Sequence, residues 1–216
     1  VPVLSQAQVV AWEKPIAAGL SYRMEVDSSA PRVVHALRWS LGAPDVSARS
    51  EVAQMRLFSG PGAEAREGIT SLIERSGAIA GINGDFFPTS GDPLNAVVRD
   101  GQILSRPFPG RACFGWGRSV SAAGLLDWTG SVNISSIGDQ PLTGLNEDVQ
   151  PDRLVLFTDS CAEARAPAKS ISLLVKMDTL GFTPSGVFKG QVASVLRNNP
   201  VIKIPQGYAV LVRPGD

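Results

Sequence analysis

The chain has 216 residues, of which 44% are hydrophobic, so it is long enough to bury a core, and we expect a single domain spanning 1–216. Its 20 basic and 20 acidic residues give a formal net charge of zero, which excludes the basic surface expected of a nucleic-acid binder. No apolar run approaches the length of a membrane-spanning helix, so we expect no membrane span. The expected partner is a small molecule or another protein.

Strands dominate the expected secondary structure, because short groups of Val, Ile and Leu are separated by Gly, Pro, Ser and Asp. Strands are predicted at 32–41, 78–82, 94–104 with a turn at Asp100-Gly101, 111–116, 130–135, 153–158, 170–175, 199–204 and 207–213. The best helix is 69–77, where Ser71 and Glu74 have the spacing of a capping box and Gly77 can end the helix in the left-handed conformation. We therefore expect an α+β fold with a strand-rich mixed or antiparallel sheet and few helices.

The cysteines and the single histidine form no metal-binding pattern. Cys113 and Cys161 are far apart in sequence, so they are either two buried thiols or one long-range disulfide. His35 lies within an apolar strand and is expected to be structural, and one imidazole excludes a His-rich zinc site. No metal site is predicted, and any cofactor stays unknown.

The segment 78–88, "AIAGINGDFFP", allows two interpretations. In the first, Asn83-Gly84 is a tight hairpin turn, and Phe86 and Phe87 resume a strand that packs in the core. In the second, Asp85 belongs to a functional site, because a part-buried carboxylate costs free energy unless it is paired or hydrogen-bonded. Two adjacent aromatic rings beside carboxylate and amide groups, supplied by Asp85, Asp92 and Asn95, would suit a sugar.

A longer stretch around this segment resembles the phosphodiester glycosidase family. The most specific part is Asn83-Gly84-Asp85-Phe86-Phe87 followed by Gly91-Asp92-Pro93, within 71–107, and "RACFGW" follows at 111–116. The segments 33–41, 144–160 and 204–216 are similar to other parts of the family. The resemblance implies hydrolysis of a sugar-1-phosphodiester, and it implies export, because family members are mostly exported or lumenal.

The resemblance also implies roles for individual residues. Asp85 would be one of the two carboxylates that glycosidases commonly use, and Asn83 would bind a sugar hydroxyl or orient Asp85. Phe86 or Phe87 would pack against the sugar ring. Arg111 is either a phosphate contact or a solvated arginine at a strand end. Asp92 and Asn95 complete the candidate substrate-binding residues, although Asp92 could equally be an ordinary turn residue.

One family feature is missing from the chain. The family's Asp-Gly-Gly-Gly-Ser signature, which contributes to the active site, does not occur in this sequence. We therefore expect the chain to be the front part of a catalytic domain, with the second carboxylate on an absent segment or a companion chain. The alternatives are a non-catalytic carbohydrate- or envelope-binding module, and a structural fragment whose last strand, 208–213, has an unpaired edge that drives dimerisation.

Overall fold

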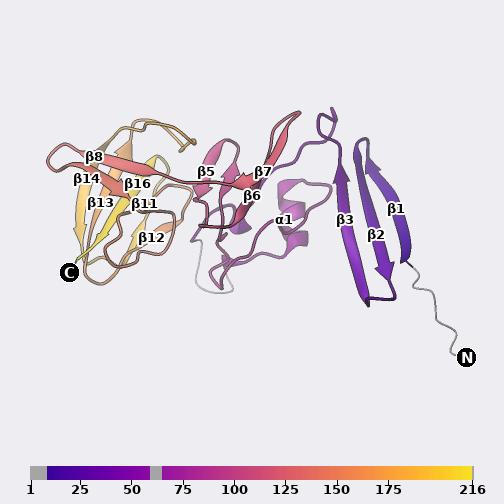
Figure 1. Cartoon of the computed structure of the whole chain (residues 1–216). Coiled ribbons are helices and arrows are strands. Elements are labelled where there is room, and N and C mark those ends of the chain that lie inside the picture. Colours follow the sequence, from indigo (N-terminus) through magenta and orange to yellow (C-terminus); the bar gives the residue numbers. More distant parts are fainter. Residues whose placement is uncertain (1–8, 59–64, 216) are drawn as a thin grey trace, which may run out of the picture. The chain divides into compact units, whose positions relative to one another are not determined.

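The structure of the chain is a computed structural model that describes residues 9–58 and 65–215 (Figure 1). The fold is mostly β, with 44% of residues in strands and 6% in helices. The predicted α+β class is therefore wrong. In the described ranges the single α-helix, α1 (Ile69–Ser76), has eight residues and buries none of them, so no helical layer covers a sheet. No helix there is both long and apolar enough to cross a membrane.

The strands form several small sheets rather than one large one. In chain order they are β1 (Val9–Ala17), β2 (Leu20–Asp27), β3 (Arg32–Trp39), β4 (Val97–Arg99), β5 (Gln102–Ser105), β6 (Ala112–Trp116), β7 (Ser121–Leu125), β8 (Gly130–Ile134), β9 (Gly138–Leu142), β10 (Gly144–Leu145), β11 (Val155–Phe157), β12 (Glu163–Arg165), β13 (Ser170–Met177), β14 (Gly190–Arg197), β15 (Val201–Lys203) and β16 (Tyr208–Pro214). Two-stranded sheets form from β4-β5, β6-β7, β8-β9 and β12-β15.

The chain divides into two compact units. The first comprises Val1–Ala48 and Phe114–Ala123, and the second comprises Arg49–Cys113 and Gly124–Asp216.

The first unit contains an antiparallel sheet with the strand order β1-β2-β3. Trp12, Met24 and His35 are cross-strand partners, so they share one face of this sheet. Aromatic contacts join the same face, with Tyr22 edge-on to Trp12 and stacked on His35. This face is largely apolar and half exposed, because Val10, Trp12 and Val33 each keep about half of their surface accessible.

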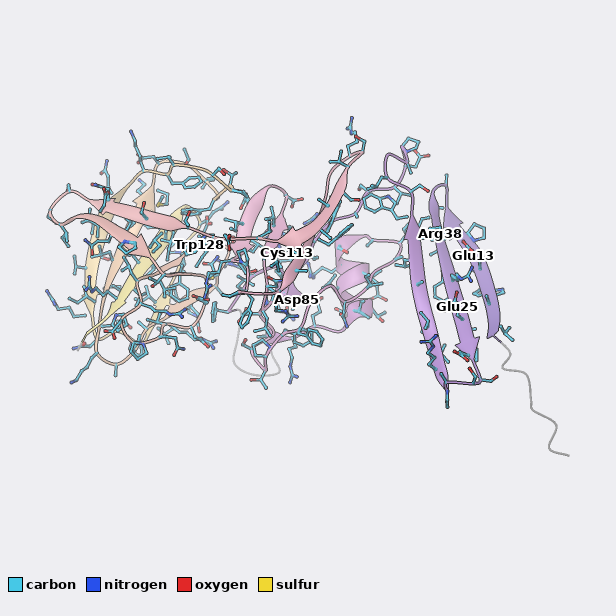
Figure 2. The ribbon with its side chains drawn as sticks, viewed as in Figure 1. Glu13, Glu25, Arg38, Asp85, Cys113 and Trp128 are labelled. Atoms are coloured by element: carbon cyan, nitrogen blue, oxygen red, sulfur yellow. The ribbon has the colours of Figure 1, made fainter. Side chains whose placement is uncertain are left out.

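The opposite face of the same sheet is charged. Figure 2 labels three residues of this face, Glu13, Glu25 and Arg38. Arg23 forms an ion pair with Glu25 at 2.6 Å. Arg23 and Arg38 each lie 3.9 Å from a Glu13 oxygen. In β2 the residues Leu20, Tyr22, Met24 and Val26 alternate with Ser21, Arg23, Glu25 and Asp27, as expected of a strand whose successive side chains point to opposite faces.

The second unit is built on a five-stranded mixed sheet with the order β10-β11-β16-β13-β14. β10 and β11 are parallel and the other neighbours are antiparallel. β16 has hydrogen-bonded partners on both sides, β11 and β13. The expectation that 208–213 has an unpaired edge is therefore wrong.

The core of the second unit combines this sheet with its neighbouring loops. Its buried members are Val52, Leu57, Phe58, Leu104, Val155, Phe157, Cys161, Ala164, Ala166, Ile202, Ile204, Val210 and Val212. Both cysteines are free thiols, so the disulfide alternative is wrong for this structure. Burial raises the pKa of the Cys161 thiol well above its ordinary value, which keeps it protonated.

The segment from the helix to β4 differs most from expectation. Gly77 adopts the predicted left-handed conformation at the helix end, but Gly68 is the N-cap and Ser71 donates to Glu67, so no Ser71–Glu74 capping box forms. The predicted strand 78–82 is absent, since the segment pairs with no other strand of the described structure, and Ile79 and Ile82 are 61% and 70% exposed. The predicted turn at Asp100-Gly101 is confirmed between β4 and β5, with both residues at positive φ.

Candidate functional site

Asp85 lies in the irregular segment between α1 and β4, where both of its carboxylate oxygens are bonded. Asn95 donates its backbone N–H to Asp85 Oδ2 at 2.6 Å, and Arg111 Nη2 lies 3.2 Å from Asp85 Oδ1. The Asp85 side chain is 18% exposed, so it is partly buried yet reachable from solvent. Because no strand flanks Asn83-Gly84, the hairpin interpretation of this segment is wrong.

An aromatic ring completes this cluster. The Arg111 guanidinium carbon lies 5.2 Å from the centre of the Phe86 ring, within cation–π range. Phe86 is 72% exposed, so one face of the cluster is an accessible aromatic surface. Arg111 is thus an ordered partner of both Asp85 and Phe86 rather than a freely solvated arginine. We call Asp85, Phe86 and Arg111 the Asp85 cluster.

The side chain of Asn95 forms hydrogen bonds with the segment 108–113, which contains Arg111 of the cluster. Its side-chain amide donates to the carbonyl of Ala112 at 3.1 Å, and its Oδ1 accepts from the backbone N–H of Phe108 at 2.9 Å and from Cys113 Sγ at 3.4 Å. The residue is buried. Its side chain, which was expected to bind substrate, bonds to these three protein groups, and its backbone N–H donates to Asp85 Oδ2.

Asp92 lies in a different environment from Asp85. Its Oδ1 accepts from the backbone N–H of Phe58 at 3.0 Å, while its buried Oδ2 has no partner among the described residues. Burial raises the pKa of Asp92 above its usual value, because the charged form is poorly solvated there. The Phe58 backbone, bonded to this carboxylate, has a φ of 49°, a conformation uncommon for an aromatic residue.

Gly91, which precedes Asp92, lies where two loops are in close backbone contact. Gly91 has a φ of 79°, and an added Cβ would lie 2.5 Å from the carbonyl oxygen of Ala65. Only glycine allows this backbone contact without displacement of the neighbouring loop. Asp92 therefore follows a point of close contact between two loops, and it makes no hydrogen bond to the Asp85 cluster in the described structure.

The two remaining predicted residues are exposed. Asn83 has no hydrogen-bond partner within the described ranges, and Phe87 is 49% exposed. The structure brings Asp85, Asn95, Phe86 and Arg111 together, whereas Asn83 and Phe87 stay beside the cluster only through their place in the chain.

Two residues near the cluster were not found by sequence analysis. Cys113 touches Asn95, and Ser105 donates to the Asn95 carbonyl and accepts from the backbone N–H of Val97 at 3.0 Å. Figure 2 labels Cys113 and Asp85. Neither residue type has a local sequence pattern that indicates such a contact, since the partners come from different loops.

Metal binding has no support from the arrangement of these side chains. Across residues 9–58 and 65–215, no group of three or more His, Cys, Asp or Glu side chains gathers in a way that could hold an ion. What the Asp85 cluster offers chemically is a carboxylate, a guanidinium and an aromatic face.

Comparison with known proteins gives a fold but no family. No protein-family model and no curated protein matches the chain. Its fold is similar to a chain described as a hypothetical protein from Synechocystis, with a TM-score of 0.66 and 15% sequence identity. The similarity covers 92% of this chain and 36% of that chain, so this chain spans about a third of its length. At this identity the likeness shows a common mostly β architecture alone.

Proposed function

We propose that this chain carries part of the site of an exported phosphodiester glycosidase, an enzyme that hydrolyses a sugar-1-phosphodiester. The observation that supports this proposal is the Asp85 cluster, in which Arg111 contacts both the carboxylate of Asp85 and the ring of Phe86. A carboxylate, a phosphate-binding cation and a flat apolar surface are the groups that a sugar phosphate needs from a protein.

Each member of the cluster has a role in this reaction. The bond between the sugar anomeric carbon and the phosphodiester oxygen breaks, and the phosphomonoester leaves with the electron pair. Water adds its oxygen to the anomeric carbon and releases its proton. Asp85 would stabilise the positively charged, oxocarbenium-like sugar, Arg111 would bind phosphate oxygens as their charge grows, and Phe86 would pack on the ring.

The reaction also needs a second carboxylate in most glycosidases. Apart from Asp85 itself, no Asp or Glu side chain is hydrogen-bonded to the cluster within the described ranges. We propose that a further segment or companion chain supplies it. Mass spectrometry of the purified material under denaturing conditions would detect a companion polypeptide, whereas the mass of this chain alone would contradict a companion chain.

The variant Asp85→Asn tests the catalytic role. In a preparation with turnover, we expect it to lower hydrolysis of a hexose-1-phosphate methyl diester by at least about 100-fold, the usual effect of losing a catalytic carboxylate. Asn keeps an acceptor for the Asn95 N–H, so the fold should survive. Release of free sugar is the measurement, and Asp100→Asn, at the exposed hairpin turn between β4 and β5, is the matched control. Turnover within a few-fold of wild type in Asp85→Asn would exclude the role.

A non-catalytic sugar-phosphate-binding module is the second candidate. It is favoured by one observation, that both oxygens of Asp85 already have partners in the structure. Binding of the same methyl diester without release of sugar, even in the presence of a companion segment, would support the module and contradict the enzyme.

A further inference from the structure

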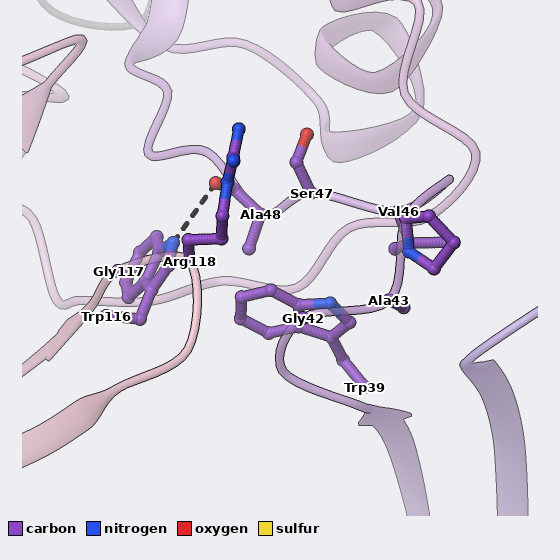
Figure 3. Close-up of a pocket in the computed structure, with 10 residues that line it drawn as sticks. Trp39, Gly42, Ala43, Val46, Ser47, Ala48, Trp116, Gly117 and Arg118 are labelled. Atoms are coloured by element: carbon purple, nitrogen blue, oxygen red, sulfur yellow. Dashed lines mark hydrogen bonds between the residues drawn. The ribbon is translucent and has the colours of Figure 1, made fainter.

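Two surfaces outside the Asp85 cluster are open to another molecule. One is the hollow of the first unit in Figure 3, where Trp116 donates its indole N–H to the carbonyl of Ala48 at 3.1 Å. Its lining has one ionisable side chain among the described residues, the exposed Arg118, and so defines no ligand class. The other surface is the outer edge of β14 in the second unit, which has a more specific chemistry.

The five-stranded sheet has two edges of very different length. At one edge, β10 has only two residues, so it offers almost no backbone for pairing. At the other edge, β14 has eight residues and pairs only with β13 among the described strands. Six of these eight residues are exposed. The outer side of β14 therefore presents backbone N–H and C=O groups to which another extended strand could bond.

The sequence of β14 contains neither the prolines nor the charges that commonly protect a free edge. Residues 190–196 include no proline and no charged residue, and the one charged side chain of the strand, Arg197, is at its end. The edge strand β1 of the first unit is different, because it contains Glu13, Lys14 and Pro15. The neutral edge of β14 therefore favours pairing, and two such edges would not repel each other.

A β-bulge at Ala193 places two exposed valines on the same face of β14. The register with β13 skips Ala193, so Val192 and Val195 point to the same side although they are three positions apart. They are 51% and 54% exposed. A bulge can turn an edge away from other chains, but this one also makes the side-chain order along the edge symmetric about the midpoint between Ala193 and Ser194. The residues on the valine face are Gly190, Val192, Val195 and Arg197.

We propose that two copies of this chain form a dimer by antiparallel pairing of their β14 edges. In the register centred between positions 193 and 194, Val192 lies opposite the partner's Val195, and the two-fold axis repeats this pair. Arg197 lies opposite the partner's Gly190, so the two arginines are at opposite ends of the paired strands. Because β10 offers no comparable second edge, pairing ends at a dimer. The proposal does not depend on the function assigned to the Asp85 cluster.

Sedimentation equilibrium of this chain tests the dimer directly. Eight residues of extended strand span about 27 Å, so the interface lies at the small end of specific interfaces and the dimer should be weak. We expect a monomer–dimer equilibrium with a dissociation constant of about 10 to 100 µM, measured between about 5 µM and 1 mM protein. A monomer throughout this range, or growth to species larger than a dimer, would overturn the proposal.

A charge placed in the interface should weaken the dimer. Val195→Lys puts an ammonium group opposite the partner's Val192 at both symmetric pairs, so we expect the dissociation constant to rise at least about tenfold. Val187→Lys is the matched control, because Val187 is 90% exposed in the loop before β14 and lies outside the pairing. Unfolding midpoints of the two variants should agree, since both positions are exposed. An equal effect of the two variants on dimerisation would contradict the β14 interface.

Mixtures of variants test the register. Val192→Glu and Val195→Lys should each weaken self-association, but together they place the new carboxylate at 192 opposite the new ammonium at 195. We therefore expect a heterodimer at concentrations where neither variant dimerises alone, detected by sedimentation with a fluorescent label on one variant. Val195→Glu mixed with Val195→Lys is the control, because position 195 does not face itself in this register. Equal recovery in both mixtures, or no heterodimer in the first, would overturn the proposed pairing.

Discussion

Asp92 is a largely buried carboxylate whose charge should make the stability of the fold depend on pH. One oxygen of its carboxylate is buried without a partner among the described residues, and burial raises the pKa of this group. A group whose pKa is higher in the folded state stabilises the fold below its unfolded pKa, and this contribution is lost as the pH rises through the folded pKa. Once Asp92 ionises, the burial of its charge therefore lowers the free energy of unfolding.

The variant Asp92→Asn should remove this cost. Asn cannot ionise, and its Oδ1 can still accept from the Phe58 N–H. We expect it to be more stable than wild type at neutral pH, on the order of 1 kcal/mol, with the gain disappearing toward acidic pH. Urea unfolding at several pH values measures this. Asp92→Ala, which loses the acceptor as well, should be destabilised, and a pH-independent loss of stability in Asp92→Asn would contradict the argument.

At the scale of elements, Glu67 joins α1 to the η1 turn (Ala53–Met55). Its carboxylate accepts from Arg75 at 2.9 Å, from Ser71 at 2.9 Å and from the backbone N–H of Gln54 at 3.0 Å. Hydrogen bonding by Arg75, the largest cause, and the other donors lower the pKa of Glu67 to about 2. The backbone at Gln54 has a positive φ, so this carboxylate also fixes an unfavourable turn conformation.

The variant Glu67→Gln should lose about 1 to 3 kcal/mol at neutral pH, because hydrogen bonds to the charged group are lost. A lowered pKa gives stability that is present above the unfolded value of 4.5 and is lost as the pH falls through about 2. The difference from wild type should therefore narrow over that interval in denaturation experiments. Glu74→Gln, exposed on the same helix, is the control, and an equal effect of the two variants would contradict a special role for Glu67.

At the scale of the whole molecule, we expect the stability of the second unit to depend on its hydrophobic core. Phe157 on β11 is fully buried and meets Phe58 with ring centres 5.7 Å apart. Phe157→Ala should cost about 3 to 5 kcal/mol by leaving a cavity, whereas Val195→Ala at an exposed position of β14 should change little. Thermal unfolding followed by near-ultraviolet circular dichroism would measure both variants, and similar midpoints for the two would contradict this assignment of the core.

Much of the strand pattern could be predicted from the sequence, because apolar runs bounded by turn residues mark β3, β13 and β16 directly. The run 78–82 has the same composition yet forms no strand, since local composition does not show whether a partner strand is present. The β1–β2 hairpin was missed, although its alternation of apolar and charged residues was a usable signal.

For the candidate site, the composition of 78–88 indicated Asp85, and the family resemblance added the roles of Phe86 and Arg111; the structure brings these three residues together. The positioning role of Asn95 could not be predicted, because its partners at 108, 112 and 113 are supplied by tertiary contacts. The hydrogen bond from the Phe58 N–H to Asp92 could not be predicted either, because the two residues are 34 positions apart in the sequence.

The central place of β16 has a consequence for synthesis of the protein on the ribosome. β16 follows both of its neighbours in sequence, so β11 and β13 leave the exit tunnel before the strand that must lie between them. Their unpaired backbone groups and apolar side chains stay accessible during that delay, when aggregation competes with folding. The five-stranded sheet is therefore completed only after β16 has left the tunnel, and chaperones that hold nascent chains would act on β11 and β13 in that interval.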